Sequence, residues 1–150
     1  YEGGNMKKRV LLSSLAGILL LSLTGCGSTE TLICTQTQEE DGATMDMKME
    51  VVFKDNLASE FTMTTDMKFD EEYADYMDTA KESFEDEFSS YKENGMDVDI
   101  QTEGTTLTAI VGANFDELTD EEKENLGFDP EENTYESVRA ELEDSGLTCE

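Results

Sequence analysis

The chain has 150 residues, of which 37 are acidic, 10 are basic and none is histidine, so its formal net charge is −27. This charge repels nucleic acid and anionic lipid headgroups, and we therefore expect no nucleic-acid partner. Without histidine, the usual general base, the Ser-His-Asp triad and most zinc sites are excluded. The acidity is typical of a soluble surface, and its alternative role is to attract cations or a basic partner.

The first 26 residues have the pattern of an export signal. Three basic residues at 7–9 precede an apolar run at 11–23, which ends in Leu23-Thr24-Gly25-Cys26. A basic head, a short apolar run and a small-residue exit are the parts of a secretory signal. The ending resembles that of bacterial lipoprotein signals, in which the cysteine becomes the lipid-bearing N-terminus. The alternative is a retained anchor helix, but the run is shorter than the roughly 20 apolar residues that a membrane span needs.

These features divide the chain into four parts. Residues 1–5 fit no part of a signal, and we interpret them as an upstream extension before a true start at Met6. Residues 6–25 are the predicted signal peptide, and residues 26–30 are the predicted tether, lipidated at Cys26. Residues 31–150 form a single acidic domain. Acyl chains on Cys26 would hold this domain on the extracytoplasmic face of the cell membrane.

The first part of the domain has the two-residue period of β-strands. We predict strands at 31–38, 44–54 and 57–69, with a turn at Asp55-Asn56. Five methionines fall on one face of the second and third strands, interleaved with polar residues on the other face. These methionines are Met45, Met47, Met49, Met63 and Met67.

The remainder of the chain changes period several times. Apolar residues spaced three and four apart predict a helix over 71–93, capped by Asp70 and ended by Gly95. A hairpin follows at 96–101 and 105–114. Capping boxes at 119–122 and 133–136 predict two short helices, and 147–149 can form a last strand. The fold class is α+β, an antiparallel sheet with helices packed on one face.

Two cysteines other than Cys26 lie near the two ends of the domain. Cys34 and Cys149 could form a disulfide in an exported compartment, and closing a loop of this length adds about 4–5 kcal/mol in the chain-entropy model. If they do, the last strand should pair beside the first. The alternative is two free thiols. Neither cysteine is part of a C-x-x-C redox motif.

Three kinds of chemistry can be weighed from the side chains. Asp129, Glu131 and Asn133 match the start of a calcium loop, but Thr134 and Ala140 occupy the positions that require glycine and a carboxylate. The five methionines could bind copper(I) through their thioethers, whereas the simpler interpretation is a core of flexible side chains. A glycosidase would need two carboxylates held in a cleft. We therefore predict no metal site, no cofactor and no catalytic residue.

The chain resembles the YehR-like family of small bacterial lipoproteins. The resemblance rests on the lipobox at Cys26, Leu32-Ile33-Cys34, the methionine- and threonine-rich strand pair and the ending Leu147-Thr148-Cys149. A central segment, 84–92, also fits. The resemblance implies an exported lipoprotein and no established activity. The expected function is therefore a lipid-anchored, non-enzymatic binding or interaction module of the cell envelope, and the alternative is a calcium- or copper-binding sensor.

Overall fold

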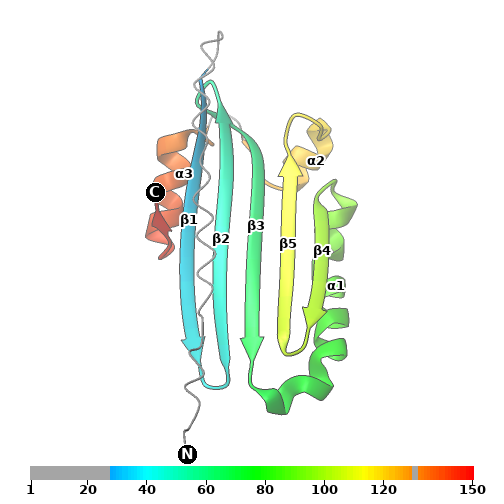
Figure 1. Cartoon of the computed structure of the whole chain (residues 1–150). Helices are drawn as coiled ribbons and strands as arrows, with labels where there is room; N and C mark the ends of the chain where they lie inside the picture. The colour runs from blue at the N-terminus through cyan, green and yellow to red at the C-terminus, as the bar shows by residue number, and fades with distance from the viewer. Residues whose placement is uncertain (1–27, 130–131) are drawn as a thin grey trace, which may run out of the picture.

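The computed structural model describes residues 28–129 and 132–150, which build a six-stranded antiparallel sheet accompanied by helices (Figure 1). The strands are β1 (Thr29–Glu40), β2 (Ala43–Lys54), β3 (Leu57–Phe69), β4 (Asp97–Glu103), β5 (Thr106–Asn114) and β6 (Thr148–Cys149). The helices are the 3₁₀ helix η1 (Glu71–Tyr76), α1 (Met77–Glu93), α2 (Asp120–Asn125) and α3 (Tyr135–Asp144). The predicted α+β class with an antiparallel sheet is confirmed.

The strands lie in the order β4-β5-β3-β2-β1-β6. The first three strands form the predicted meander, and β5 then pairs with β3 and leaves β4 at one edge. Because strand side chains alternate between faces, residues opposite one another share a face. One row that crosses the sheet consists of Cys34, Met49, Met63, Val111 and Val98.

The buried core lies on the face that carries this row. Near β1 the cluster contains Leu32, Val51 and Phe53, and α3 contributes Val138 and Leu142 to its edge. Near β4 the cluster is centred on Ile100 and Leu107, with Phe84 and Phe88 of α1 packed against it. In Figure 1 the three α-helices all lie behind the sheet, with α3 beside β1 and α1 beside β4.

Two turns depend on backbone conformations that the sequence signalled. Asp55 and Asn56 both have positive φ, 52° and 65°, which is the conformation of a tight two-residue hairpin turn. Gly95 follows α1 with φ of 85°, as predicted for a left-handed cap. A Cβ at Gly95 would also meet Leu118 Cδ2 at 2.7 Å, so a side chain here would displace the loop that carries Leu118.

The first strand begins earlier than predicted. Thr29 and Glu30, which we expected in the tether, pair with Lys54 and Phe53 and belong to β1. The main chain of Ser28 also accepts a hydrogen bond from the Asp55 N–H at 2.9 Å. Backbone pairing with β2 therefore extends the strand into a segment that carries no apolar signal of its own.

The structure differs from the prediction at two helix starts, although the first helical segment begins at Glu71 after Asp70 as predicted. Residues 71–76 form a 3₁₀ helix, and the side chain of Asp70 makes no capping hydrogen bond. The second capping box is Thr134 with Ser137, so the predicted cap at Asn133 is one residue early. A β-bridge between Leu57 and Thr134 keeps residue 134 extended, which delays the helix.

Hydrogen-bonded polar side chains connect the strands on the opposite face of the sheet. Asp46 on β2 accepts hydrogen bonds from the Thr37 hydroxyl at 2.8 Å and from Lys68 Nζ at 3.1 Å, on the two neighbouring strands. Asp66 accepts one from Thr108 at 2.6 Å. The bond from Thr37 and then that from Lys68 lower the pKa of Asp46 below its ordinary value.

We expect Asp46→Asn to lower the free energy of unfolding by no more than about 1 kcal/mol at neutral pH, because the pair is exposed. The ionised carboxylate contributes its full stabilisation above the ordinary carboxyl pKa of 3.8, and the difference from the native protein should disappear as the pH falls from 3.8 through the lowered pKa of Asp46 in the folded protein. Urea unfolding at several pH values measures this. Glu39→Gln is the matched control, since it removes the same charge from the same face of the sheet, on the neighbouring strand β1. Equal effects of the two variants would show that net charge, and not the hydrogen bonds of Asp46, causes the change.

Candidate functional site

The residues of the predicted export signal, Leu23, Thr24, Gly25 and Cys26, lie outside the described residues. The two other cysteines are joined: Cys34 Sγ and Cys149 Sγ form a disulfide with an S–S distance of 1.99 Å. The two residues are also register partners of β1 and β6. The last strand thus lies beside the first, as a disulfide between these positions requires.

Two residues of the calcium-loop pattern, Asp129 and Asn133, are joined by the hydrogen bonds of a turn. The side-chain amide of Asn133 donates a hydrogen bond to the main-chain carbonyl of Asp129, and the Asn133 carbonyl accepts one from the Ala58 N–H. Glu131 lies outside the described residues. Across residues 28–129 and 132–150, no three His, Cys, Asp or Glu side chains are grouped so that they could hold a metal ion.

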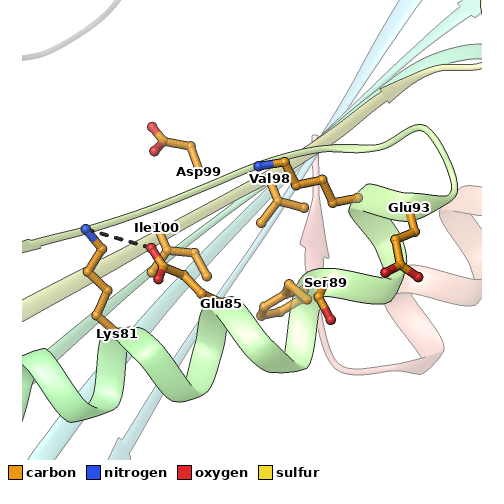
Figure 2. A pocket seen from close by; sticks show the side chains of 9 residues that line it. Lys81, Glu85, Ser89, Glu93, Val98, Asp99 and Ile100 are labelled. Atoms are coloured by element: carbon orange, nitrogen blue, oxygen red, sulfur yellow. Dashed lines mark ion pairs between the residues drawn. The ribbon is translucent and has the colours of Figure 1, made fainter.

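A groove of about 640 Å³ runs between α1 and the edge strand β4 (Figure 2). Three carboxylates line it, and they do not converge. Glu85 pairs with Lys81 at 3.8 Å, whereas Asp99 points away from the helix (Figure 2). Val98 and Ile100 point toward α1 (Figure 2). Because acid–base hydrolysis needs two carboxylates aimed at one bond, this groove has the wrong geometry for a glycosidase.

The five methionines of β2 and β3 form a more distinctive surface, here named the methionine patch. The register places Met45 opposite Met67 and Met49 opposite Met63, with Met47 opposite Thr65 between the two pairs. All five methionines are half-buried. We predicted that they would lie in the core; they lie at its edge, where four of them pack against the core clusters.

The methionine patch is partly exposed because the helices contact the sides of the sheet. The main sheet contacts of α1 are with β4, and those of α3 are with β6 and β1. The patch belongs to β2 and β3, which lie between these two pairs of strands. Its methyl and thioether groups therefore keep part of their surface in water, at a cost of about 25 cal/mol for each Å² of apolar area.

One recess borders the methionine patch, and a second lies beyond Met63 at Phe61 of the same strand. At the turn between β1 and β2, a recess of about 210 Å³ is lined by Met45, Met67 and Phe69, with Glu40 and Gln38 at its side. The second recess, of about 310 Å³, has mainly aromatic walls and is lined by none of the five methionines. Those walls include Phe61, Tyr91, Phe115 and Phe128, of which the last two stack with ring centroids 4.0 Å apart.

The charge around the methionine patch is negative on both sides. Residues 71–93, which include η1 and α1, contain nine acidic and two basic side chains, a net charge of −7. Residues 135–144, which form α3, contain four acidic side chains and one arginine, a net charge of −3. The patch itself contains no charged side chain. An apolar surface between acidic helices can bind an apolar group that carries positive charge.

The five methionines and their shared face could be read from the sequence, but the two recesses and the exposure of the patch could not. The recess at the aromatic end combines residues from β3, α1 and the loops around α2, which no local pattern connects. The capping box of Thr119 and Glu122, which the sequence did signal, begins α2 near this recess.

No protein family model matches the chain, and no curated protein matches it. Among solved structures, the chain is similar to an NMR structure of a protein from Streptococcus pneumoniae TIGR4, with a TM-score of 0.52 and 12% sequence identity. The similarity covers 82% of this chain and 86% of that chain. At this level of identity the similarity shows a shared fold. In the described part of the chain, every helix is too short or too polar to cross a membrane.

Proposed function

We propose that this protein is a lipid-anchored, non-enzymatic binding module of the cell envelope and that its binding site is the methionine patch with the recesses near its two ends. The observation that carries the proposal is the half-burial of all five methionines on the two central strands. The five methionines surround Thr65, which is 6% exposed, and each keeps part of its apolar side chain accessible to a ligand. Methionine side chains are flexible and polarizable, so they adapt to ligands of different shapes.

The cellular location belongs to the same proposal and rests on the signal-like motif that ends at Cys26. Lipid at this residue agrees with membership of the YehR-like family. We also propose that the helices pack on one face of the sheet only. The polar face then carries no helix, and α1 and α3 shield the methionine patch from solvent on two sides. Mass spectrometry of the membrane-extracted protein tests the anchor: an unmodified thiol at Cys26, with residues 6–25 still attached, contradicts it.

The binding site is tested with protein labelled with ¹³C at the methionine methyl groups. A soluble nitroxide should broaden the methyl signals of Met45, Met47, Met49, Met63 and Met67. Met77 and Met96, which are 5% and 9% exposed, are internal controls and should keep sharp signals. Because broadening requires close approach of the nitroxide, equal protection of all seven signals would show that the patch is closed and would contradict the proposed function.

A second candidate function is copper(I) binding, which the strand register favours. Residues directly opposite each other in an antiparallel pair have Cβ atoms about 4.5–5.5 Å apart, so the sulfurs of Met45 and Met67 can reach a common point, as can those of Met49 and Met63. Thioethers are soft ligands that select copper(I). With the same labelled protein, copper(I) should shift the methyl signals of at least one of these pairs. Unchanged signals at excess copper(I) would remove this candidate.

A further inference from the structure

We infer that the methionine patch binds a basic amphipathic α-helix, and this inference rests on the proposed function. The dimensions of the sheet provide the first argument. The backbone of α1 contacts β4, and that of α3 contacts β6 and β1. Side chains of the helices reach one strand further in, since Tyr135 of α3 packs on Phe53 of β2 and Phe84 of α1 belongs to the cluster that includes Met67 of β3. The midpoint of β4 and β5 lies four strand spacings from the midpoint of β1 and β6, which is about 19 Å at about 4.8 Å per strand.

Helices pack with their axes about 8–10 Å apart, so a separation of about 19 Å leaves room for one further helix between α1 and α3. At the Phe61 end of β3, Phe115 and Phe128 already pack on this face of the sheet, so the partly exposed stretch runs from Met63 to Phe69. Six residue steps in a strand span about 20 Å, the length of a helix of about 13 residues. The partly exposed part of the sheet therefore has the width and length of a single helix of nearly four turns.

Charge complementarity specifies the chemistry of that helix. The patch is apolar, whereas residues 71–93 and α3 carry net charges of −7 and −3 and the whole chain carries −27. A helix with leucine-like residues at positions i, i+3, i+4 and i+7 would place them on the methionines. Its remaining positions face the acidic helices and solvent, where lysine and arginine are favoured and glutamate is repelled.

The same charges argue against a second copy of this chain as the occupant. Two molecules that each carry −27 repel one another, and a symmetric contact would bring their acidic helices together. An anionic membrane surface is repelled for the same reason. The partner is therefore a cationic amphipathic peptide, or a basic amphipathic helix that belongs to another protein.

The experiment uses fluorescence anisotropy with the purified protein and a labelled peptide of about 13 leucine and lysine residues in which leucine occupies one helical face. We expect this peptide to bind at least tenfold more tightly than a peptide of the same composition with shuffled order. A third peptide with glutamate in place of lysine should show no binding. Added salt should weaken the affinity, because the charges are exposed. Tight binding of the shuffled peptide, or of the glutamate peptide, would overturn the inference.

Two variants locate the binding site. Met47→Lys places a positive charge in the middle of the methionine patch and should weaken the affinity at least tenfold. Thr62→Lys is the matched control, since it makes the same charge change on the opposite face of β3, next to Glu50 on β2. It should change the affinity by less than threefold. Equal losses in the two variants would show that net charge alone attracts the peptide, which would overturn the inference.

Folding and self-association are checked in the same samples. If circular dichroism shows that Met47→Lys is unfolded, Met45→Lys replaces it, because Met45 lies outside the core clusters and borders the 210 Å³ recess. Sedimentation that shows a dimer, with the patch protected, would identify a second copy as the occupant and overturn the inference. Accessible methionine signals together with no peptide binding would leave the proposed function intact while overturning the inference.

Discussion

Replacing both Cys34 and Cys149 with alanine is expected to lower the free energy of unfolding by about 4 kcal/mol. The disulfide closes a loop with a sequence separation of 115 residues. In the chain-entropy model, a crosslink of about 100 residues removes unfolded-state entropy worth about 4.7 kcal/mol, and native disulfides in exported domains are typically worth about 2–5 kcal/mol. For a domain of this size, the loss should reduce Tm by about 10–15 °C.

The last strand depends strongly on this bond. β6 has two residues, and its contacts with β1 are the register pairs of Cys34 with Cys149 and Thr35 with Thr148. The Glu150 N–H adds a hydrogen bond of 2.9 Å to the Ile33 carbonyl. Without the disulfide, the few backbone hydrogen bonds of so short a strand hardly compensate for the conformational entropy that the strand loses on folding. The amide hydrogen of Glu150 should therefore exchange with solvent much faster.

Thermal and urea unfolding, with and without a thiol reductant, measure the effect. Reductant should lower Tm of the native protein by about the same amount as the double alanine variant. The variant is its own control, because reductant should leave its Tm unchanged. A native protein that is equally stable in both conditions would show that the two thiols are free in solution, which is the alternative left by the sequence.

The strands were predictable because a half-buried strand leaves a strong two-residue pattern. The alternation of Met45, Met47 and Met49 with polar residues identified the face that turns to the core. The turn at Asp55-Asn56 was predictable because few residues other than glycine tolerate positive φ. In each case a local chemical requirement determines the local backbone.

The strand order could not be read in the same way. Both β4 and β5 alternate apolar and polar residues, so the sequence does not say which of them pairs with β3. The structure places β5 inside, where Leu107 and Ala109 are almost completely buried, and β4 at the edge with Asp97 and Asp99 exposed. Charged residues on an edge strand discourage pairing with other chains, which is consistent with that position.

The exposure of the methionine patch could not be predicted from the sequence either. Alternation shows which face of a strand is apolar, but it does not show whether a helix covers that face. α1 has 17 residues and α3 has 10, and both pack toward the sides of the sheet. The patch is partly exposed because the helices do not fully cover it. Where the helices pack depends on the assembled fold and not on the local sequence of β2 and β3.

Phe53→Ala is expected to lower the free energy of unfolding by about 3–5 kcal/mol, which is the usual cost of deleting a fully buried phenylalanine. Phe53 is completely buried and is among the largest such side chains in the described part of the chain. Its ring meets that of Tyr135 edge to face, with centroids 5.3 Å apart, so it connects β2 to α3. Removing it leaves a cavity between the sheet and α3 that the neighbouring residues can fill in part.

Phe69→Ala is the matched control, because Phe69 is half-buried and borders the open 210 Å³ recess. Water already reaches this end of the sheet, so the deletion should cost less than half as much as that of Phe53. Urea unfolding with a constant m-value measures both changes. Equal losses would mean that the recess beside Phe69 is closed in solution. The core at Phe53 would then extend without interruption across the methionine patch, leaving no free apolar surface for a ligand.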